Sequence, residues 1–269
     1  MPSKLLARYP SLRRTTNRPG VQWLIKLARR QLLVRERGRF LLGEMRGGIG
    51  CYRLAIDGQR HAVIRHRTRD MEIFEEMFSK GAYTPPGPAA ARIAELTRPL
   101  RVLDLGGNIG LFGVDALIRY PGAEITSYEA DPTNVPVLQR CVDLNAGAWR
   151  VVQACAMARD GVARIDSGNF ADSRVGDDGV EVRAIDVLPL FGDFDFVKMD
   201  IESSEWPILT DERWPSAMRD VALFVLEWHQ HGAPQPDARS VAVAAVRAAG
   251  FEIDASPPGH DHGVIWGWR

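Results

Sequence analysis

The chain of 269 residues has little cysteine and no long hydrophobic run. Its three cysteines are odd in number and lack metal-ligand spacing, which disfavours both a disulfide framework and a cysteine-based metal site. No stretch reaches the about 18 apolar residues that a membrane helix needs, and the N-terminus lacks the uninterrupted apolar core of a signal peptide. We therefore expect a soluble cytoplasmic protein without a membrane span.

An excess of charge of one sign is also missing. The 34 Lys and Arg residues balance the 34 Asp and Glu residues, so no overall field attracts nucleic acid or an anionic membrane. The local exception is residues 1–38, which are basic and have the apolar spacing of an amphipathic helix. We interpret this helix as packing on the main domain or on a second subunit of a homodimer; a membrane or nucleic-acid surface is the other interpretation.

The segment before the main domain is expected to hold a hairpin. Residues 52–56 and 61–65 alternate between apolar and polar, and the pair Asp57-Gly58 between them is a strong turn signal. Thr68 then caps a helix that we expect to run through Phe78, and another helix is expected at 89–97. We place a domain boundary here, with an N-terminal extension at 1–66 and the main domain at 67–269.

From residue 100 onward, strand-like and helix-like segments alternate. Strands are expected near 100–105, 124–129, 150–155, 194–199, 221–228, 250–255 and 262–268, with a helix at 237–249. Such alternation predicts an α/β fold with a mainly parallel seven-stranded sheet, helices on both faces, and one antiparallel strand near the C-terminus. Residues 180–185 alternate as well and are expected to form a short edge strand.

One motif joins the first two of these strands. A buried strand from Val102 leads into glycines at 106, 107 and 110, and Glu129 ends the next strand. Glycine lets a backbone approach a ligand closely, and an acid at this distance is typical of a group that binds ribose hydroxyls. The spacing does not match the G-x-G-x-x-G motif of dinucleotide-binding proteins, because Asn108 and Leu111 stand where that motif has glycines. Asp104 on the strand end repels a pyrophosphate but favours a cationic ligand. The motif therefore predicts a site for S-adenosylmethionine (SAM).

Several motifs occur in a familiar order. They are Asp104-Leu105-Gly106-Gly107-Asn108-Ile109-Gly110, Tyr128-Glu129-Ala130-Asp131-Pro132, the run from Val197 to Glu205, and Glu227-Trp228-His229. Together with 68–83 they resemble the FkbM-type family of SAM-dependent methyltransferases over about residues 65–230. The resemblance implies a Rossmann-like class I methyltransferase fold and O-methylation of hydroxyls on natural products, sugars and lipid-linked saccharides. One departure is Glu202-Ser203-Ser204-Glu205, where the family usually has Glu-Gly-Ala-Glu.

The predicted cofactor site follows from strand ends. Ligands of open α/β sheets bind beyond the carboxyl ends of the strands, where Asp104, Glu129, Asp200 and Glu227 are expected to gather. Glu129 is expected to accept hydrogen bonds from the ribose, and the glycine turn to face the amino-acid tail. The full predicted cofactor set is Asp104, Gly106, Gly107, Asn108, Gly110, Glu129, Ala130 and Ala156, with Ala156 beside the adenine.

We assign proton transfer and candidate metal binding to the ends of the later strands. His229 shares a strand face with Glu227, titrates near neutrality, and is the expected general base; Glu227 and Asp200 are the other expected catalytic residues. Asp200, Glu202 and Glu205 are oxygen ligands that suit Mg²⁺. Their spacing lacks an adjacent acidic pair, so we do not favour a metal, and the two glutamates also suit a helix N-terminus.

The leading hypothesis is an O-methyltransferase for a small-molecule or glycosylated acceptor, with SAM as its cofactor. The alternatives are an N-methyltransferase on a similar molecule, a metal-assisted O-methyltransferase, and a non-catalytic SAM-binding subunit. The acceptor itself cannot be read from these motifs.

Overall fold

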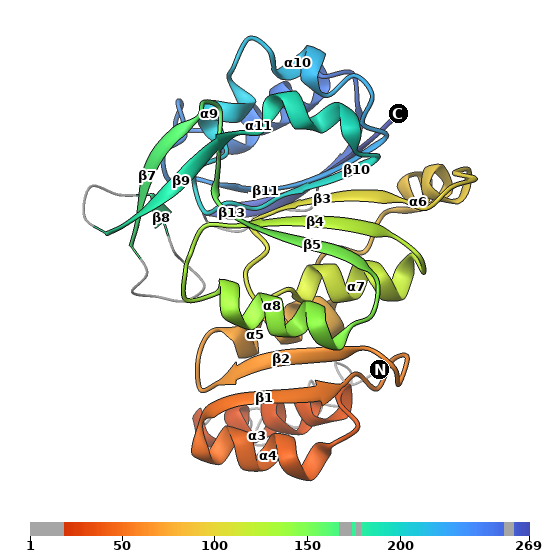
Figure 1. Cartoon of the computed structure of the whole chain (residues 1–269), viewed down its shortest axis with the longest axis vertical. Coiled ribbons are helices and arrows are strands. Elements are labelled where there is room, and N and C mark those ends of the chain that lie inside the picture. The colour runs from red at the N-terminus through yellow and green to blue at the C-terminus, as the bar shows by residue number, and fades with distance from the viewer. Residues whose placement is uncertain (1–18, 167–173, 176–178, 256–260) are drawn as a thin grey trace, which may run out of the picture.

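The computed structural model describes residues 19–166, 174–175, 179–255 and 261–269. These residues form a seven-stranded sheet between two helical layers, a four-stranded sheet beside it, and a two-stranded hairpin with its own helices (Figure 1). Each helix in the described ranges is too short or too polar to cross a membrane. Residues 256–260, which join the last two strands, lie outside the described residues.

The central sheet has the order β12-β13-β11-β10-β3-β4-β5. Its strands are β3 (Arg101–Leu105), β4 (Glu124–Glu129), β5 (Ala148–Gln153), β10 (Phe196–Met199), β11 (Leu223–His229), β12 (Glu252–Ala255) and β13 (His262–Trp268). All neighbours from β5 to β11 pair in parallel, and β13 runs antiparallel to both β11 and β12. The predicted mainly parallel seven-stranded sheet with one reversed strand is confirmed.

Helices cover both faces of this sheet (Figure 1). On one face lie α7 (Leu111–Arg119) and α8 (Val135–Leu144); on the other lie α9 (Trp206–Leu209), α10 (Trp214–Ala217) and α11 (Ala238–Ala248). The 3₁₀ helix η3 (Leu188–Asp193) packs beside α10. Central strands of a sheet covered on both faces must be apolar throughout, and every residue of β10 is buried. Even Lys198, the polar member of that strand, is only 2% exposed.

The segment 154–186 corrects two expectations. The expected strand at 150–155 is divided. The last bond to β4 is from Ala154 N–H to Glu129 O, and the chain then leaves the main sheet and forms a separate β6 (Cys155–Met157). Residues 180–186 form β9, which is an inner strand of a second sheet, not an edge strand. That sheet has the order β6-β9-β7-β8, with β7 (Gly161–Asp166) and β8 (Arg174–Val175).

The N-terminal part of the described chain forms a further layer under α7 and α8 (Figure 1). It contains α3 (Pro19–Arg30), the 3₁₀ helix η1 (Gln31–Leu33), α4 (Arg37–Arg46), β1 (Gly48–Arg53) and β2 (His61–His66). The expected hairpin is present, but its first strand begins and ends earlier, since Leu54 bridges to Val34 instead of continuing the ladder. No observation tests the boundary that we place at residue 66, and it stays a prediction.

Between the hairpin and the main sheet the chain forms α5 (Asp70–Glu75) and the π-helix η2 (Glu76–Lys80). The single helix expected through Phe78 is therefore α-helical only to Glu75. Gly81, in the left-handed conformation, ends the π-helix and turns the chain toward Tyr83. Single π turns inside helices are frequent at functional sites. The helix α6 (Gly87–Ala94) follows, two to three residues earlier than expected.

Candidate active site

The glycine turn lies at the point where the sheet order reverses. From β3 the chain winds outward to β4 and β5, and it then returns to β10 on the other side of β3. Gly106 follows β3 with φ at +84°, and a Cβ there would overlap the carbonyl oxygen of Asp200, which follows β10. A side chain is thus excluded twice, by conformation and by space. The crevice at this switch point is where ligands bind in open α/β sheets.

Glu129 holds the turn from the end of β4. Its Oε2 accepts the Asn108 N–H at 2.6 Å, and its Oε1 accepts the Asp131 N–H at 2.8 Å. The amide of Asn134 adds a contact at 3.3 Å. Burial raises the pKa of Glu129 to about 7, although these donors act to lower it. Within the described residues Oε2 accepts only the Asn108 N–H and can accept a second hydrogen bond, so the acid retains capacity toward a ligand hydroxyl.

Two cavities meet at this turn. The larger one, about 630 Å³, reaches from the π-helix to the ends of β10 and β11, and the smaller one, about 70 Å³, lies over the ends of β4 and β6. Gly106, Asn108, Asp200 and Glu202 line both. The smaller cavity has to widen before a nucleoside can enter, since ligand pockets usually measure about 300 Å³ or more. A ligand that spans the shared border would reach from one cavity into the other.

The cofactor residues predicted from sequence fall into two groups. Glu129, Ala130 and Ala156 line the smaller cavity, and Gly107 lines the larger one. Asp104 and Gly110 line neither cavity, and their assignment to the cofactor stays a prediction. Asp104 is fully buried below the turn, where it accepts the Ser127 hydroxyl at 2.8 Å. Gly110 begins α7 and lies against Leu138 of α8, so its missing side chain serves helix packing.

Three side chains meet at the floor of the larger cavity. The Tyr83 hydroxyl donates to Glu227 Oε2 at 2.6 Å or to Asp200 Oδ2 at 3.0 Å. Burial and the nearby Asp200 charge raise the pKa of Glu227 to about 7. Burial and the same two carboxylates raise the pKa of Tyr83 well above its ordinary value, so its proton stays in place. Glu227 is therefore close to half ionised at neutral pH, next to a fixed donor.

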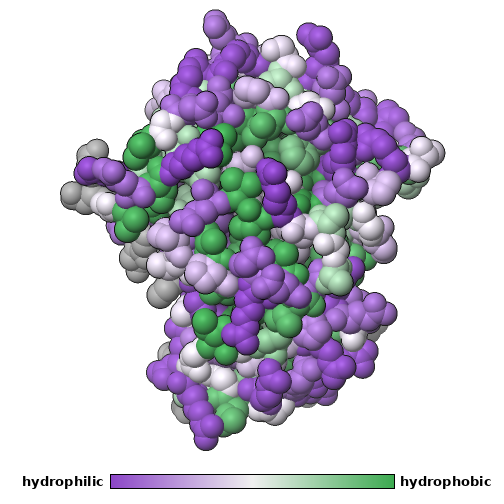
Figure 2. All heavy atoms as spheres, in the orientation of Figure 1, coloured by the Kyte–Doolittle hydropathy of each residue, from purple (hydrophilic) through white to green (hydrophobic). Residues whose placement is uncertain are grey.

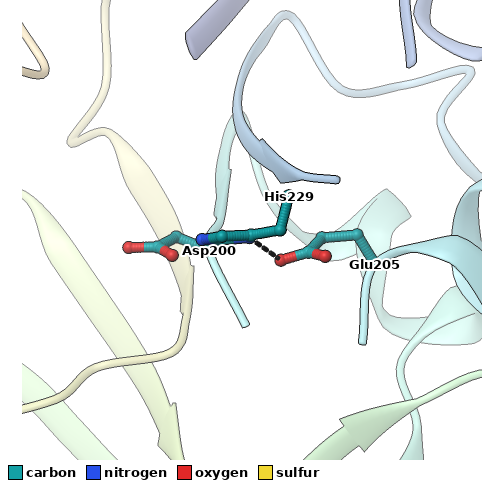
Figure 3. Close-up of side chains that lie close together, drawn as sticks. All are labelled: Asp200, Glu205 and His229. Carbon is teal, nitrogen blue, oxygen red and sulfur yellow. Dashed lines mark hydrogen bonds and ion pairs between the residues drawn. The ribbon is translucent and has the colours of Figure 1, made fainter. Parts of the chain in front are cut away.

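His229 lies between two acids at the end of β11. Its Nδ1 is 3.0 Å from Glu205 Oε1, and Figure 3 shows its ring between the carboxylates of Glu205 and Asp200. Its Nε2 lies 3.6 Å from Glu202. Burial acts to lower the pKa of His229, but the hydrogen bond and charge of Glu205, with the charges of Asp200 and Glu202, raise it to about 9. The imidazole is thus mostly protonated at neutral pH in the unliganded protein.

The acids only partly fit a metal ion. Asp200, Glu205 and His229 offer ligand atoms within 4.8 Å of one another, whereas Glu202 of the expected set is not in this group. Glu205 Oε1 already accepts N–H groups of Ile201 and Ser203 besides the imidazole. Glu205 stands at the N-cap of α9 (Trp206–Leu209), but its side chain makes no capping hydrogen bond and instead holds the preceding turn. Asp200 Oδ2 lies 3.5 Å from the Lys198 ammonium. A resident divalent ion does not fit this arrangement of donors.

Two residues of the site were missed from sequence. Tyr83 stands in a proline-rich loop, and Lys198 is part of a buried strand. Neither has a spacing signal, because their partners lie far away in the chain. Ser203 was noted as a departure from the family pattern, and it has φ at +77°, the left-handed region where glycine is favoured. The neighbouring Glu202 is also left-handed, with φ at +51°.

Comparisons with known proteins give similarity to solved structures alone. No family model matches the chain, and no curated protein matches it in sequence. A precorrin-6y C5,15-methyltransferase from Geobacter metallireducens is 15% identical with a TM-score of 0.40, over 71% of this chain and 93% of the other. A fibrillarin from Aeropyrum pernix with natively bound SAM is 14% identical with a TM-score of 0.39, over 82% and 94%.

A SAM-dependent methyltransferase from Agrobacterium tumefaciens is 14% identical with a TM-score of 0.46, over 83% of this chain and 70% of the other. The strand order and the reversed β13 make the described fold a Rossmann-like class I methyltransferase fold, as predicted. What the chain does has to be argued from its own site.

Proposed function

We propose that the chain is a SAM-dependent O-methyltransferase acting on a hydroxyl of a small-molecule or glycosylated acceptor, such as a natural product or its sugar. The observation that supports this proposal is the junction of two cavities at the glycine turn, one beside Glu129 and the other lined by titratable side chains. Glu129 binds the ribose hydroxyls, and Ala130 and Ala156 face the adenine. Gly106, Gly107 and Asn108 face the amino-acid tail. When bound, SAM supplies the methyl group and its leaving thioether.

The larger cavity suits a hydroxylated acceptor. Its lining is rich in groups that exchange hydrogen bonds with alcohols, namely Glu72, Glu76, Asp200, Glu202, Glu227, Gln230, His231, Asp261 and His262. Apolar contributions come from Met77 and Phe112, at the side of the π-helix and α7. Such a mixture fits a sugar or polyol that presents both hydroxyls and C–H faces. Displacement at carbon requires alignment above all, and the protein then removes the acceptor's proton.

His229 is the proposed general base. Its Nδ1–H donates to Glu205, which leaves Nε2 as the proton-accepting atom of the neutral ring, facing Glu202 and the cavity. With a pKa of about 9, roughly one molecule in 100 carries the neutral ring at pH 7. A positive charge beside the ring lowers that pKa, so a bound sulfonium increases the neutral fraction.

Glu227 is the second candidate base. Its pKa of about 7 makes it half ionised at neutral pH without any ligand. The Tyr83 hydroxyl holds its carboxylate at the cavity floor. The two candidates predict different rate profiles, since a His229 base gives a rate that rises toward pH 9 and a Glu227 base one that levels off above pH 7.

The test is transfer of a labelled methyl group from SAM to a panel of hydroxylated acceptors, with matched amines, followed by location of the methyl group by NMR. O-methyl products support the proposal, and products methylated only on nitrogen contradict it in favour of an N-methyltransferase. The rate of His229→Asn and Glu227→Gln is then followed from pH 6 to 10. The base is the residue whose replacement removes the rise of rate with pH. A protein that binds SAM but methylates none of the acceptors is a non-catalytic subunit.

We also propose that the N-terminal region forms a homodimer contact. Exposed large apolar side chains occur there at Trp23, Leu32, Leu42, Met45 and Ile49. Figure 2 shows hydrophilic residues over most of one face of the protein, with apolar residues visible through its middle. Light scattering of wild type and of a variant with Trp23 and Met45 changed to Ser tests this contact. An unchanged monomer in both contradicts it.

A further inference from the structure

Lys198 is a buried ammonium that the proposed reaction leaves unexplained. It stands in the middle of the sheet on β10, opposite Asp104 of β3 and Val225 of β11. Its side chain is 3% exposed, and a lysine is seldom buried unless its charge is compensated. Lys198 also lines the larger cavity, so its head group faces the same crevice as the acids.

Four oxygen atoms surround this ammonium. The Gly106 carbonyl oxygen accepts a hydrogen bond from Nζ at 2.7 Å, and the Leu105 carbonyl oxygen lies at 3.3 Å. Carboxylate oxygens of Asp104 and Asp200 lie at 3.4 and 3.5 Å. The rings of Tyr83 and Phe112 stand 5.9 and 5.8 Å away, within cation–π range. The ammonium thus joins the backbone of the cofactor turn to acids from two different strands.

The charges around Lys198 require a cation at this position. Asp104 is buried beside Asp200, and Tyr83 links Asp200 to Glu227, so three carboxyl groups share one small region. Burial alone acts to lower the pKa of Lys198, yet the charges of Asp200, Asp104 and Glu227 outweigh it and raise that pKa. Burial raises the pKa of Asp104, and Lys198 opposes that change.

We propose that Lys198 is a positioning residue that takes the structural place of a divalent metal: its ammonium is the resident cation that fixes the Gly106 turn against Asp200. Metal-assisted methyl transfer would use an ion to bridge the strand-end carboxylates. Here the Lys198 ammonium contacts the carboxylates of Asp104 and Asp200. It also donates hydrogen bonds to the carbonyl oxygens at the start of the turn. The inference rests on the proposed function only for its cofactor readout, since Mn²⁺ binding is measured without cofactor or acceptor.

The test is calorimetric titration with Mn²⁺ of wild type, Asp200→Asn, Lys198→Ala and the double variant Lys198→Ala/Asp200→Asn. We expect wild type and Asp200→Asn to have the same Mn²⁺ affinity, because the Lys198 ammonium already occupies this position. Lys198→Ala, freed of the ammonium, is expected to bind Mn²⁺ at least about tenfold more tightly than wild type, and the double variant is expected to lose that gain. Lys198→Arg, which keeps the charge, is the control and should behave as wild type toward Mn²⁺.

Affinity for S-adenosylhomocysteine gives a second readout. Lys198→Ala is expected to bind it at least about tenfold more weakly because the Gly106 turn loses its anchor, with a smaller loss for Lys198→Arg. Mn²⁺ should restore part of that affinity in Lys198→Ala, which a purely structural role of the lysine would not allow. Tight Mn²⁺ binding by wild type that Asp200→Asn abolishes overturns the proposal, and this measurement decides even if Lys198→Ala does not fold. A folded Lys198→Ala with unchanged cofactor and metal affinity overturns it as well.

Discussion

The phenol oxygen of Tyr83 lies 2.6 Å from Glu227 Oε2, although 144 residues separate the two in the chain. This contact joins the loop behind the π-helix to the carboxyl end of β11, and it brings a donor to an acid whose pKa is about 7. The segment before the main sheet thus contributes a functional group to the strand-end site. Tyr83 is 7% exposed, so its position is set by the packing around it.

Tyr83→Phe is expected to raise the pKa of Glu227 further. The hydroxyl stabilises the ionised carboxylate, and a hydrogen bond to a charged group of about 1.5 kcal/mol corresponds to roughly one pKa unit. NMR of carboxyl-labelled glutamate checks this shift without any acceptor. Tyr120→Phe is the matched control, because that ring packs against Phe196 away from Glu227. An unchanged titration of Glu227 in Tyr83→Phe would contradict the assigned hydrogen bond.

The stability of the unliganded protein should fall as pH rises from about 6.5 to 9. The pKa of His229 is about 9 in the folded protein and 6.5 in a model compound, so the folded state holds its proton more tightly. This stabilisation is fully present below pH 6.5 and disappears by pH 9; a shift of that size is worth about 3 kcal/mol at most. Urea unfolding of wild type and His229→Gln at a series of pH values measures it.

His229→Gln keeps a donor for Glu205 and should lack this decline. His262→Gln is the control, since the His262 side chain is 59% exposed and begins β13 beside His229. Equal pH dependence in wild type and His229→Gln would show that the imidazole carries no raised pKa. His229 would then be largely neutral at pH 7, which would strengthen it as the general base.

Ser203→Gly is expected to stabilise the fold. A left-handed conformation costs a side-chain-bearing residue about 1–2 kcal/mol, more than the roughly 0.5–1 kcal/mol of backbone entropy that glycine adds. In addition, the buried Ser203 hydroxyl finds no hydrogen-bond partner among the described residues. The melting temperature should rise by about 2 °C. Ser204→Gly, whose φ is not left-handed, should lower it, and a lower melting temperature for Ser203→Gly contradicts this reasoning.

Activity should survive removal of divalent ions. Lys198 and the protonated His229 already place positive charge among the acids, so no step of the proposed reaction depends on Mg²⁺. Methyl transfer after EDTA treatment and gel filtration checks this expectation. A loss of rate that added Mg²⁺ restores would instead favour a metal-assisted reaction and would also count against the role given to Lys198.

The parts of the fold that depend on local pattern could be predicted from sequence. The strand from Glu124 to Glu129 has the predicted bounds, because β-branched and aromatic residues that follow a Pro-Gly turn indicate a strand. The glycine turn and Glu129 could be identified together, since their spacing along the chain is fixed by one βαβ unit. A mainly parallel sheet places the carboxyl ends of its strands along one edge, which predicts that Asp200, Glu227 and His229 lie close together. These three residues do line one cavity.

The remaining parts depend on contacts between distant segments. Whether Asp104 faces a ligand or a neighbouring side chain is decided by Ser127 and Lys198, which sequence spacing does not reveal. The π-helix at 76–80 has the same apolar spacing as the α-helix that we expected. The second sheet was missed because β8 has only two residues and the alternation in β7 is confined to Ala163–Asp166. The pairing of β9 with β6 and β7 is set by the fold and has no signal in the sequence.

Calorimetry with S-adenosylhomocysteine tests the central claim most directly. Glu129→Ala should weaken binding about 10–100-fold, because a charged acceptor for the ribose is lost, while Glu124→Ala, at the exposed start of the same strand, should bind as wild type. Melting curves of both variants confirm that they are folded. A folded Glu129→Ala that binds S-adenosylhomocysteine as tightly as wild type would contradict the cofactor site and the methyltransferase function proposed from it.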